Sequence, residues 1–352
     1  MPMANGKNAE PKFHHYVSRF ILKEFAYRSK GDEHYVKVYD KHTDRLFTPN
    51  IKVIMGERLF NTASSDGVDL TIEDTTAKFD DLAAPAIEQV RSELSLRDLS
   101  ADSRTAIILF IALQVNRGTG ARNVAEDIIN QFRARLLEEY DEEDLPPQVT
   151  QFQDENQKKL FGMGLAVGGV RKIAGVLATR QMIVMAAENN GELLLGDNPV
   201  VIHNSRKSDE YHGNLGIACK GIEIYLPISP KLVIALWCPS IYEEMKRALD
   251  SSVVSLKKFK STQLLSINPA SQQTRNLIEQ LEEKIIDLKH ICGAIETESP
   301  VIMNKDVVLH QNSLQISYAE RYLISKSGRF DPAEKMIGSN PLFRKGSRMK
   351  MS

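Results

Sequence analysis

Cysteines and long apolar runs are both scarce in this sequence. Only Cys219, Cys238 and Cys292 occur among 352 residues, and no two of them form a CxxC pair. That scarcity argues against a disulfide framework or a zinc knuckle, and it favours a reduced, cytoplasmic compartment. The most apolar glycine-rich run, LFGMGLAVGGV, covers only residues 160–170. A membrane span needs about 20 apolar residues, so we expect no membrane segment. The first residues, MPMANGKNAEPK, lack the apolar core of a signal peptide.

A strong overall charge is also missing, since the formal net charge is -1. Such a chain has no global field that attracts nucleic acid or an anionic membrane, so a nucleic acid or nucleotide would have to bind through a local basic patch. The sequence contains no GxxxxGK[ST], HExxH or GxSxG motif, and no GxGxxG follows a predicted strand. No nucleotide cofactor motif is therefore recognised.

The order of apolar patterns predicts an α+β fold that is mainly helical, with a small antiparallel sheet packed on the helices. Polar turns separate short β-rich runs within residues 193–236, and residues 35–48 read as a hairpin. Ser100 or Asp102 is a suitable N-cap for a helix within the segment 99–117. Further helices are expected at 13–26, 69–94, 122–139, 170–189, 272–292 and 314–324.

We expect one folded domain with unstructured ends. Residues 1–12 are predicted to be a disordered tail, 13–328 a single α+β domain with a helical insertion around 239–305, and 329–352 a basic flexible tail. Within the insertion, an apolar face runs from Leu277 to Cys292 and suggests a homo-oligomer contact through the 277–292 helix. The Gly164-xxx-Gly168 spacing suggests close helix packing.

Two carboxylates that can share one helix face are the first candidates for chemistry. Glu73 and Asp80 are seven residues apart, which is nearly two helical turns. Such a pair can hold a divalent metal or divide acid and base roles. The alternative is an acidic, solvent-exposed helix face.

The stretch FIALQVNRGTGAR places polar residues where the apolar stripe should continue. Gln114 and Arg117 would then face the core, where an unpaired charge is costly. Either they pair with carboxylates such as Glu73 and Asp80, or they line a pocket for an anionic ligand. Arg122 lies just beyond the glycines and could bind a phosphate together with Arg117.

Two further segments offer an acid and a base. Asp197 lies in GDNP between two apolar runs, which is typical of a turn but also of a catalytic or metal-binding carboxylate at a strand end. His14 and His15 are adjacent, and on a helix they would point about 100° apart. We therefore expect one of them to face the acidic helix, as a metal ligand or paired with a carboxylate, and the other to pack or face solvent.

Six segments in order resemble a widespread, mostly bacterial family known as domain of unknown function 4238. The segments are HHYVSRFILKEFA, TIEDTTAKFD, FIALQVNRGTGAR, GDNPVVI, LPISPKLVIAL and NSLQISYAERYLIS. The sequence departs from the family pattern at three places. Ser18 stands where a proline is usual, Asp80 stands where a glutamate is usual, and RGTG replaces RTP.

The resemblance implies a set of polar positions but no activity. These positions are His14 or His15, Glu73, Gln114, Arg117, Arg122, Asp197 and Asn312. One hypothesis makes the chain a metal-dependent nuclease or phosphodiesterase, for instance a toxin or a phage-defence effector. His14, His15, Glu73 and Asp197 would then be catalytic. Arg117, Arg122 and Gln114 would bind phosphate, and Glu73, Asp80 and Asp197 would hold Mg²⁺ or Mn²⁺.

Two other hypotheses remain open at this point. The polar set could be a structural network in a non-enzymatic interaction module. Alternatively, the same residues could serve a metal-independent hydrolase or transferase that acts on a nucleotide.

Overall fold

The computed structural model describes residues 13–65, 67–150, 152, 154–206, 214–265 and 272–347. The tail expected at 1–12 lies outside these residues. The helices are α1 (Arg19–Glu24), α2 (Glu73–Glu93), α3 (Ala101–Arg117), α4 (Thr119–Leu136), α5 (Pro147–Thr150), α6 (Glu155–Gly168), α7 (Val170–Leu177), α8 (Pro239–Leu265), α9 (Gln272–Glu296), α10 (Lys305–Tyr318) and α11 (Asp331–Ser339).

The strands form two principal sheets and three two-stranded sheets. They are β1 (Phe13–His15), β2 (Arg28–Lys30), β3 (Glu33–Tyr35), β4 (Lys37–Asp40), β5 (Arg45–Phe47), β6 (Gly56–Arg58), β7 (Thr62–Ser65), β8 (Val68–Thr71), β9 (Gln181–Ala187), β10 (Leu195–Gly196), β11 (Val201–Asn204), β12 (Ile222–Pro227), β13 (Leu232–Trp237), β14 (Val301–Met303) and β15 (Tyr322–Ser325). One sheet has the order β11-β12-β13-β9-β14 and the other β10-β15-β4-β5.

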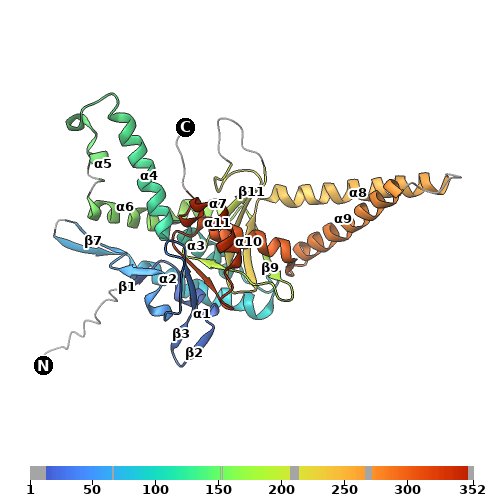
Figure 1. The fold of residues 1–352 in the computed structure, drawn as a ribbon, viewed down its shortest axis with the longest axis horizontal. Helices are drawn as coiled ribbons and strands as arrows, with labels where there is room; N and C mark the ends of the chain where they lie inside the picture. The colour runs from blue at the N-terminus through green and yellow to red at the C-terminus, as the bar shows by residue number, and fades with distance from the viewer. Residues whose placement is uncertain are drawn as a thin grey trace.

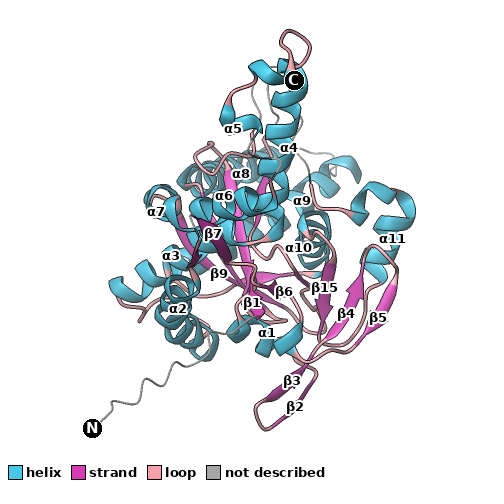
Figure 2. Cartoon of the chain, turned by 90° about the vertical axis from the view of Figure 1, so that its left-hand side faces the viewer, coloured by secondary structure: helices cyan, strands magenta, loops and turns pink. Residues whose placement is uncertain are grey.

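The mainly helical α+β fold is confirmed, and β4 and β5 lie at one edge of the body, below α11 in Figure 2. The predicted hairpin is also found, as β4 and β5. Of the strands within 193–236, β10 joins the sheet of this hairpin through β15, whereas β11, β12 and β13 belong to the other sheet. The β9–β14 pair is parallel, and the other ladders are antiparallel. Every residue of β13 is buried, as expected for a strand covered on both faces.

Helix α3 lies at the centre of the main apolar core. The Ser100 hydroxyl accepts a hydrogen bond from the backbone N–H of Ser103, so Ser100 is the N-cap. Ile107, Phe110 and Ile111 are fully buried on one side of the helix. The helix packs against α2, α6 and α7. Its position explains how Gln114 and Arg117, one turn further on, come to be buried as well.

Three predicted helices have different bounds or a different structure. The helix expected at 170–189 ends at Leu177, and residues 181–187 form β9, because their apolar side chains complete the sheet between β13 and β14. The segment 13–26 begins as strand β1, and α1 starts only at Arg19. The helix expected at 314–324 runs from 305 to 318, and residues 322–325 form β15.

The segment 239–305 contains a long helical arm that extends away from the body (Figure 1). Helices α8 and α9 pack on each other along this arm. Ile285 and Cys292, from the predicted apolar face, are buried, whereas Leu277 remains 39% exposed. The apolar face of α9 is thus largely covered by α8 of the same chain, and the contact with a second copy through 277–292 stays a prediction.

Two local expectations are wrong. Residues 331–344 do not form a flexible tail, because they fold as α11 and a 3-10 turn and bury Ala333 and Ile337 against Phe330 and Leu323. Gly164 and Gly168 do not support close helix packing within the chain, since a Cβ added at either would meet nothing within 4 Å.

Candidate functional site

The opening histidines point in opposite directions because they lie on a strand. His14 is buried, and its Nδ1 accepts a 2.9 Å hydrogen bond from the backbone N–H of Asn61. The same atom lies 3.5 Å from Oε1 of Glu73. His15 instead bonds through Nε2 to the carbonyl of Ile51 at 2.8 Å, and burial lowers its pKa to about 4. His14 is therefore the histidine that faces the acidic helix.

Asn61 joins His14 and Glu73 to Arg122, in a set that we call the His14 cluster. The Asn61 amide donates to Glu73 Oε1 at 2.5 Å, and its Oδ1 accepts from Arg122 at 3.2 Å. Arg122 also donates to the carbonyl of Phe60 at 2.9 Å and lies 3.4 Å from the centre of the Phe60 ring. Burial lowers the Arg122 pKa to about 10, so the guanidinium stays charged at neutral pH.

A second buried set, the Ser18 network, consists of Ser18, Asp80, Gln114 and Arg117. Arg117 Nη1 lies 2.8 and 3.0 Å from the two oxygens of Asp80. The Ser18 hydroxyl donates to Asp80 at 2.8 Å and accepts from the Gln114 amide at 3.0 Å. Of the two alternatives for Arg117, an ion pair or a ligand pocket, the structure shows the ion pair, and its partner is Asp80. Ser18, where the family usually has proline, contributes the hydroxyl that links the network.

Asp197 is buried at a turn and holds a loop from the other end of the chain. Its two oxygens accept the backbone N–H groups of Glu320, Arg321 and Tyr322 at 2.7, 2.9 and 2.9 Å. Burial raises the pKa of Asp197 to about 6. The three hydrogen bonds favour the charged form and lower the pKa, but the effect of burial is larger. Its carboxylate therefore positions the 320–322 loop.

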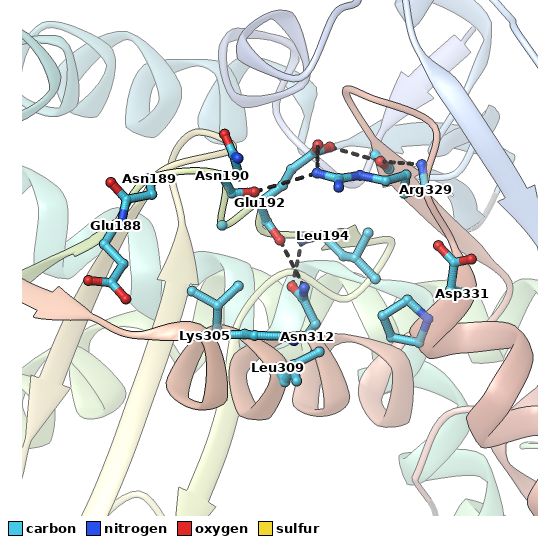
Figure 3. Close-up of a pocket in the computed structure, with 14 residues that line it drawn as sticks. Glu188, Asn189, Asn190, Glu192, Leu194, Lys305, Leu309, Asn312, Arg329 and Asp331 are labelled. Atoms are coloured by element: carbon cyan, nitrogen blue, oxygen red, sulfur yellow. Dashed lines mark hydrogen bonds and ion pairs between the residues drawn. The ribbon is translucent and has the colours of Figure 1, made fainter.

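Asn312, the remaining polar position of the resemblance, also supports the backbone. Its Oδ1 accepts from the N–H of Leu194 and its amide donates to the carbonyl of Glu192, at 2.8 and 2.9 Å. Asn312 lines a cavity of about 540 Å³, and the apolar side chains of Leu194, Val308 and Leu309 are also part of its lining. Figure 3 shows Asn312 with Leu194 and Leu309 in this cavity. Glu192 and Arg329 lie across this cavity and are 3.8 Å apart.

A different cavity collects residues from four of the six quoted segments, and we call it the acidic pocket. It has a volume of about 510 Å³, within the range of small-molecule sites. The lining residues are Tyr16, His42, Gly56, Glu57, Thr119, Asn123, Glu126, Asp127, Asp197, Glu320, Arg321, Tyr322 and Lys345. Five of these side chains are carboxylates, against His42, Arg321 and Lys345 as cations or potential cations. The pocket therefore has an excess of negative charge at neutral pH.

Close contact between two glycines and an asparagine brings the GTG and GDNP segments together beside this pocket. A Cβ at Gly120 would lie 1.7 Å from Asn198 Nδ2, and one at Gly118 would lie 2.6 Å from Oδ1. Only residues without a side chain fit there. The RGTG sequence thus lets the start of α4 approach the turn that carries Asp197.

The three residues that were predicted to bind phosphate do not lie in a common pocket. Arg117 and Gln114 belong to the Ser18 network and Arg122 to the His14 cluster, and none of the three lines either cavity described above. The predicted metal ligands Glu73, Asp80 and Asp197 are likewise separated into three hydrogen-bonded sets. Across the described ranges, no group of three or more His, Cys, Asp or Glu side chains is arranged around one point.

Sequence reasoning missed several residues of these sites. Asn61 lies in a loop and Glu57 on a three-residue strand, so neither follows a helical or strand periodicity that would mark it. Glu320 and Arg321 are inside the quoted segment NSLQISYAERYLIS, but the predicted helix was extended over them. The adjacent opposite charges of Glu320 and Arg321, directly before the apolar run YLIS, were the signal that could have identified them.

These observations define an α+β protein with two hydrogen-bonded polar sets in its interior and one open, carboxylate-lined pocket. The sequence profile of the family described as "Protein of unknown function (DUF4238)" matches residues 14–329, and the chain belongs to this family. No curated protein and no solved structure is significantly similar to the chain.

One apolar helical segment stands out by length and composition. Within the described residues, Glu155–Leu177 is the single stretch that is long and apolar enough to cross a membrane, and only 28% of its most apolar part is buried. By itself this is weak evidence for a span.

Proposed function

We propose that the chain is a metal-dependent hydrolase of phosphodiester bonds, a nuclease or phosphodiesterase, whose active site is the acidic pocket. The observation that carries the proposal is the pocket itself, a cavity where four of the six quoted segments meet and carboxylates predominate. An excess of carboxylates repels a phosphate unless a divalent cation lies between them. The lining is therefore suited to a phosphate substrate that arrives with, or binds to, such a cation.

The donor set fits Mg²⁺ or Mn²⁺. Both ions prefer carboxylate oxygens, and Mg²⁺ is commonly held by only one or two carboxylates, with waters and substrate phosphates completing its shell. A site of this type does not need three converging side chains. Glu57 and Asp127 are the two lining carboxylates that would hold the ion, and when bound it would activate a water and neutralise the charge that develops on phosphate.

Other side chains of the pocket would orient and neutralise the substrate. Lys345 offers a positive charge that a phosphate oxygen can approach. Burial raises the pKa of Tyr16, and the negative charges of Asp197 and Glu57 raise it further. The phenol therefore stays protonated and can donate a hydrogen bond. Arg321 is held by Asp40 at 2.8 Å, and Asp197 fixes the loop that presents Glu320 and Arg321.

Cleavage of labelled DNA, RNA and bis(p-nitrophenyl) phosphate with Mg²⁺ or Mn²⁺ tests the proposal. Wild-type protein should cleave at least one substrate, and Glu57→Gln and Asp127→Asn should each lower the rate by about 100-fold or more. Glu279→Gln, an exposed change on α9, is the matched control and should keep full activity. Cleavage that persists in chelator would favour a metal-independent hydrolase or transferase instead.

The second candidate function is a non-enzymatic interaction module. The Ser18 network favours it, because Gln114 and Arg117 of α3 bond to Ser18 and Asp80 in the interior and line neither of the two cavities. Absence of cleavage on every substrate, with Asp127→Asn and wild-type proteins equally inert, would support this reading over the hydrolase.

A further inference from the structure

The apolar helices α6 and α7 leave one face uncovered. They follow each other as the segment Glu155–Leu177, whose most apolar part is only 28% buried. Their inner face packs against α3. On the outer face Phe161 is 41% exposed, and a Cβ at Gly164, Gly168 or Gly175 would meet nothing within 4 Å. No described part of the chain fills the space above these glycines.

The exposed face has a definite order of side chains. Successive residues of an α-helix are rotated by about 100° around its axis. On this basis one stripe, which covers about 100° of the surface of α6 and α7, contains acidic, polar, aromatic, small and basic positions in turn. Its members are Asp154, Gln157, Phe161, Gly164, Gly168, Arg171, Lys172 and Gly175. The stripe is acidic at its amino-terminal end and basic toward its carboxyl-terminal end, with a bulky ring and two glycines between.

This order is complementary to itself when the direction is reversed. In a two-fold symmetric, antiparallel pair, residue i of one copy faces residue j of the other and j faces i. One register places Asp154 opposite Arg171, Gln157 opposite Gly168, and Phe161 opposite Gly164 of the second copy. All three pairs share the same midpoint, between Gly162 and Met163. The register thus matches opposite charges and sets the largest side chain against a glycine.

We propose that the outer face of α6 and α7 is a homodimer contact in which these helices pack antiparallel against those of a second copy. The glycines would let the two backbones approach closely, and the Phe161 rings would fill the space above Gly164. Phe161 already packs on Phe152 in an edge-to-face contact, so its ring position is set within one copy.

A membrane is the other surface that an exposed apolar helix could meet. The uncharged run between Lys159 and Arg171 covers residues 160–170, which is about 16 Å of helix and roughly half of a hydrocarbon core. The run itself is flanked by two cations, Lys159 and Arg171, but on the exposed stripe the first charges on either side are Asp154 and Arg171, which have the opposite signs that a reversed copy of the same helix requires. These features favour a second copy.

The mass of the full chain in solution tests the dimer. Light scattering after size exclusion should give twice the 39.6 kDa of one copy for wild-type protein. Gly164→Leu should lower the association constant at least about tenfold, because the side chain occupies the place of Phe161 of the second copy. Leucine favours helix over glycine, so this variant should fold at least as well as wild type. Gly175→Leu, on the same exposed stripe but beyond the three pairs, is the matched control and should remain dimeric.

A charge exchange tests the register. Arg171→Asp alone should weaken the dimer. Asp154 is also the N-cap of α6, where its Oδ1 accepts from the N–H of Gln157, so the exchanged variant, Asp154→Arg with Arg171→Asp, is compared with Asp154→Arg alone. The exchange should raise the association constant above that of either single variant, since the pair is reversed on both copies. A wild-type protein that is monomeric and floats with phosphatidylcholine–phosphatidylserine vesicles would overturn the proposal in favour of a membrane contact. A dimer unaffected by Gly164→Leu would overturn it as well. None of these readouts depends on the proposed hydrolase activity.

Discussion

The Ser18 network and the acidic pocket are both built from polar residues of the family segments, yet they are physically different. In the network, Arg117 and Asp80 are paired at 2.8 Å and Arg117 is 3% exposed. In the pocket, carboxylates line an open cavity and Glu57 is exposed to solvent. Charges that are paired and buried stabilise one packing arrangement, whereas an excess of one sign around a cavity is available to a ligand.

This comparison separates two roles that a sequence cannot distinguish. A polar residue on the apolar stripe of a helix is equally compatible with a buried ion pair and with a ligand site. The structure assigns Gln114 and Arg117 to the first kind. Changes in the network should therefore alter the free energy of unfolding, and changes at the pocket rim should alter activity with little effect on stability.

The largest effect is expected from Arg117→Ala. The change leaves Asp80 without its cationic partner in a mostly buried position, which should lower the free energy of unfolding by about 3–5 kcal/mol. Urea unfolding followed by circular dichroism measures the loss. In the control, Asp80→Ala added to Arg117→Ala should recover part of it, because the unpaired carboxylate is then gone. A single variant within 1 kcal/mol of wild type would show that the pair is not a structural element.

Asp197 should make stability depend on pH. Its pKa is about 6 when folded, against 3.8 for an unperturbed group, so between pH 4 and pH 6 the folded state binds more protons than the unfolded state. The free energy of unfolding must then fall as the pH rises through this range, by up to about 3 kcal/mol from this group. Asp197→Asn cannot titrate and should lack this contribution. Unfolding curves of both proteins at pH 4 and pH 7 measure this contribution. The free energy of unfolding of wild type minus that of the variant should be smaller at pH 7 than at pH 4, and a difference that does not fall would contradict the assignment.

A smaller loss is expected from Gly120→Ala. The added methyl would collide with the Asn198 amide, so the turn carrying Asp197 must shift, at a cost of about 1–3 kcal/mol. Gly338→Ala on α11 is the matched control, because its Cβ would meet nothing within 4 Å. Thermal melts of the two variants should differ clearly, and equal melting temperatures would contradict the close contact.

The smallest effect on stability is expected from Glu57→Gln at the pocket rim. An exposed substitution of this kind should change the free energy of unfolding by no more than about 0.5 kcal/mol. The same variant should lose at least about 100-fold in divalent-ion-dependent cleavage. A variant destabilised as strongly as Arg117→Ala would place Glu57 with the structural residues.

Local patterns predicted much of the fold. The Ser100 cap and the apolar stripe identified α3, and alternation identified the β4–β5 hairpin. The prediction failed at β9, since QMIVMAA becomes a strand only because β13 and β14 lie on either side of it. It also failed at β15, where the decisive partners, β4 and β10, are far away in the chain.

The candidate site was less predictable than the fold. Adjacency on a helix correctly grouped Gln114 with Arg117, and the ion pair with Asp80 was one of the two alternatives considered. The pocket depends on contacts between distant segments, such as the three N–H groups of residues 320–322 on Asp197. No periodicity within one segment encodes such a contact.

Binding of Mn²⁺ to the full chain tests the central claim most directly. Electron paramagnetic resonance of free Mn²⁺ should show saturable binding to wild-type protein, weakened at least tenfold by Asp127→Asn together with Glu57→Gln. Glu73→Gln, in the His14 cluster, should bind the ion as wild type does. Binding that is lost in Glu73→Gln and retained in the pocket variant would contradict the account, and it would return the metal site to the helix that begins at Glu73.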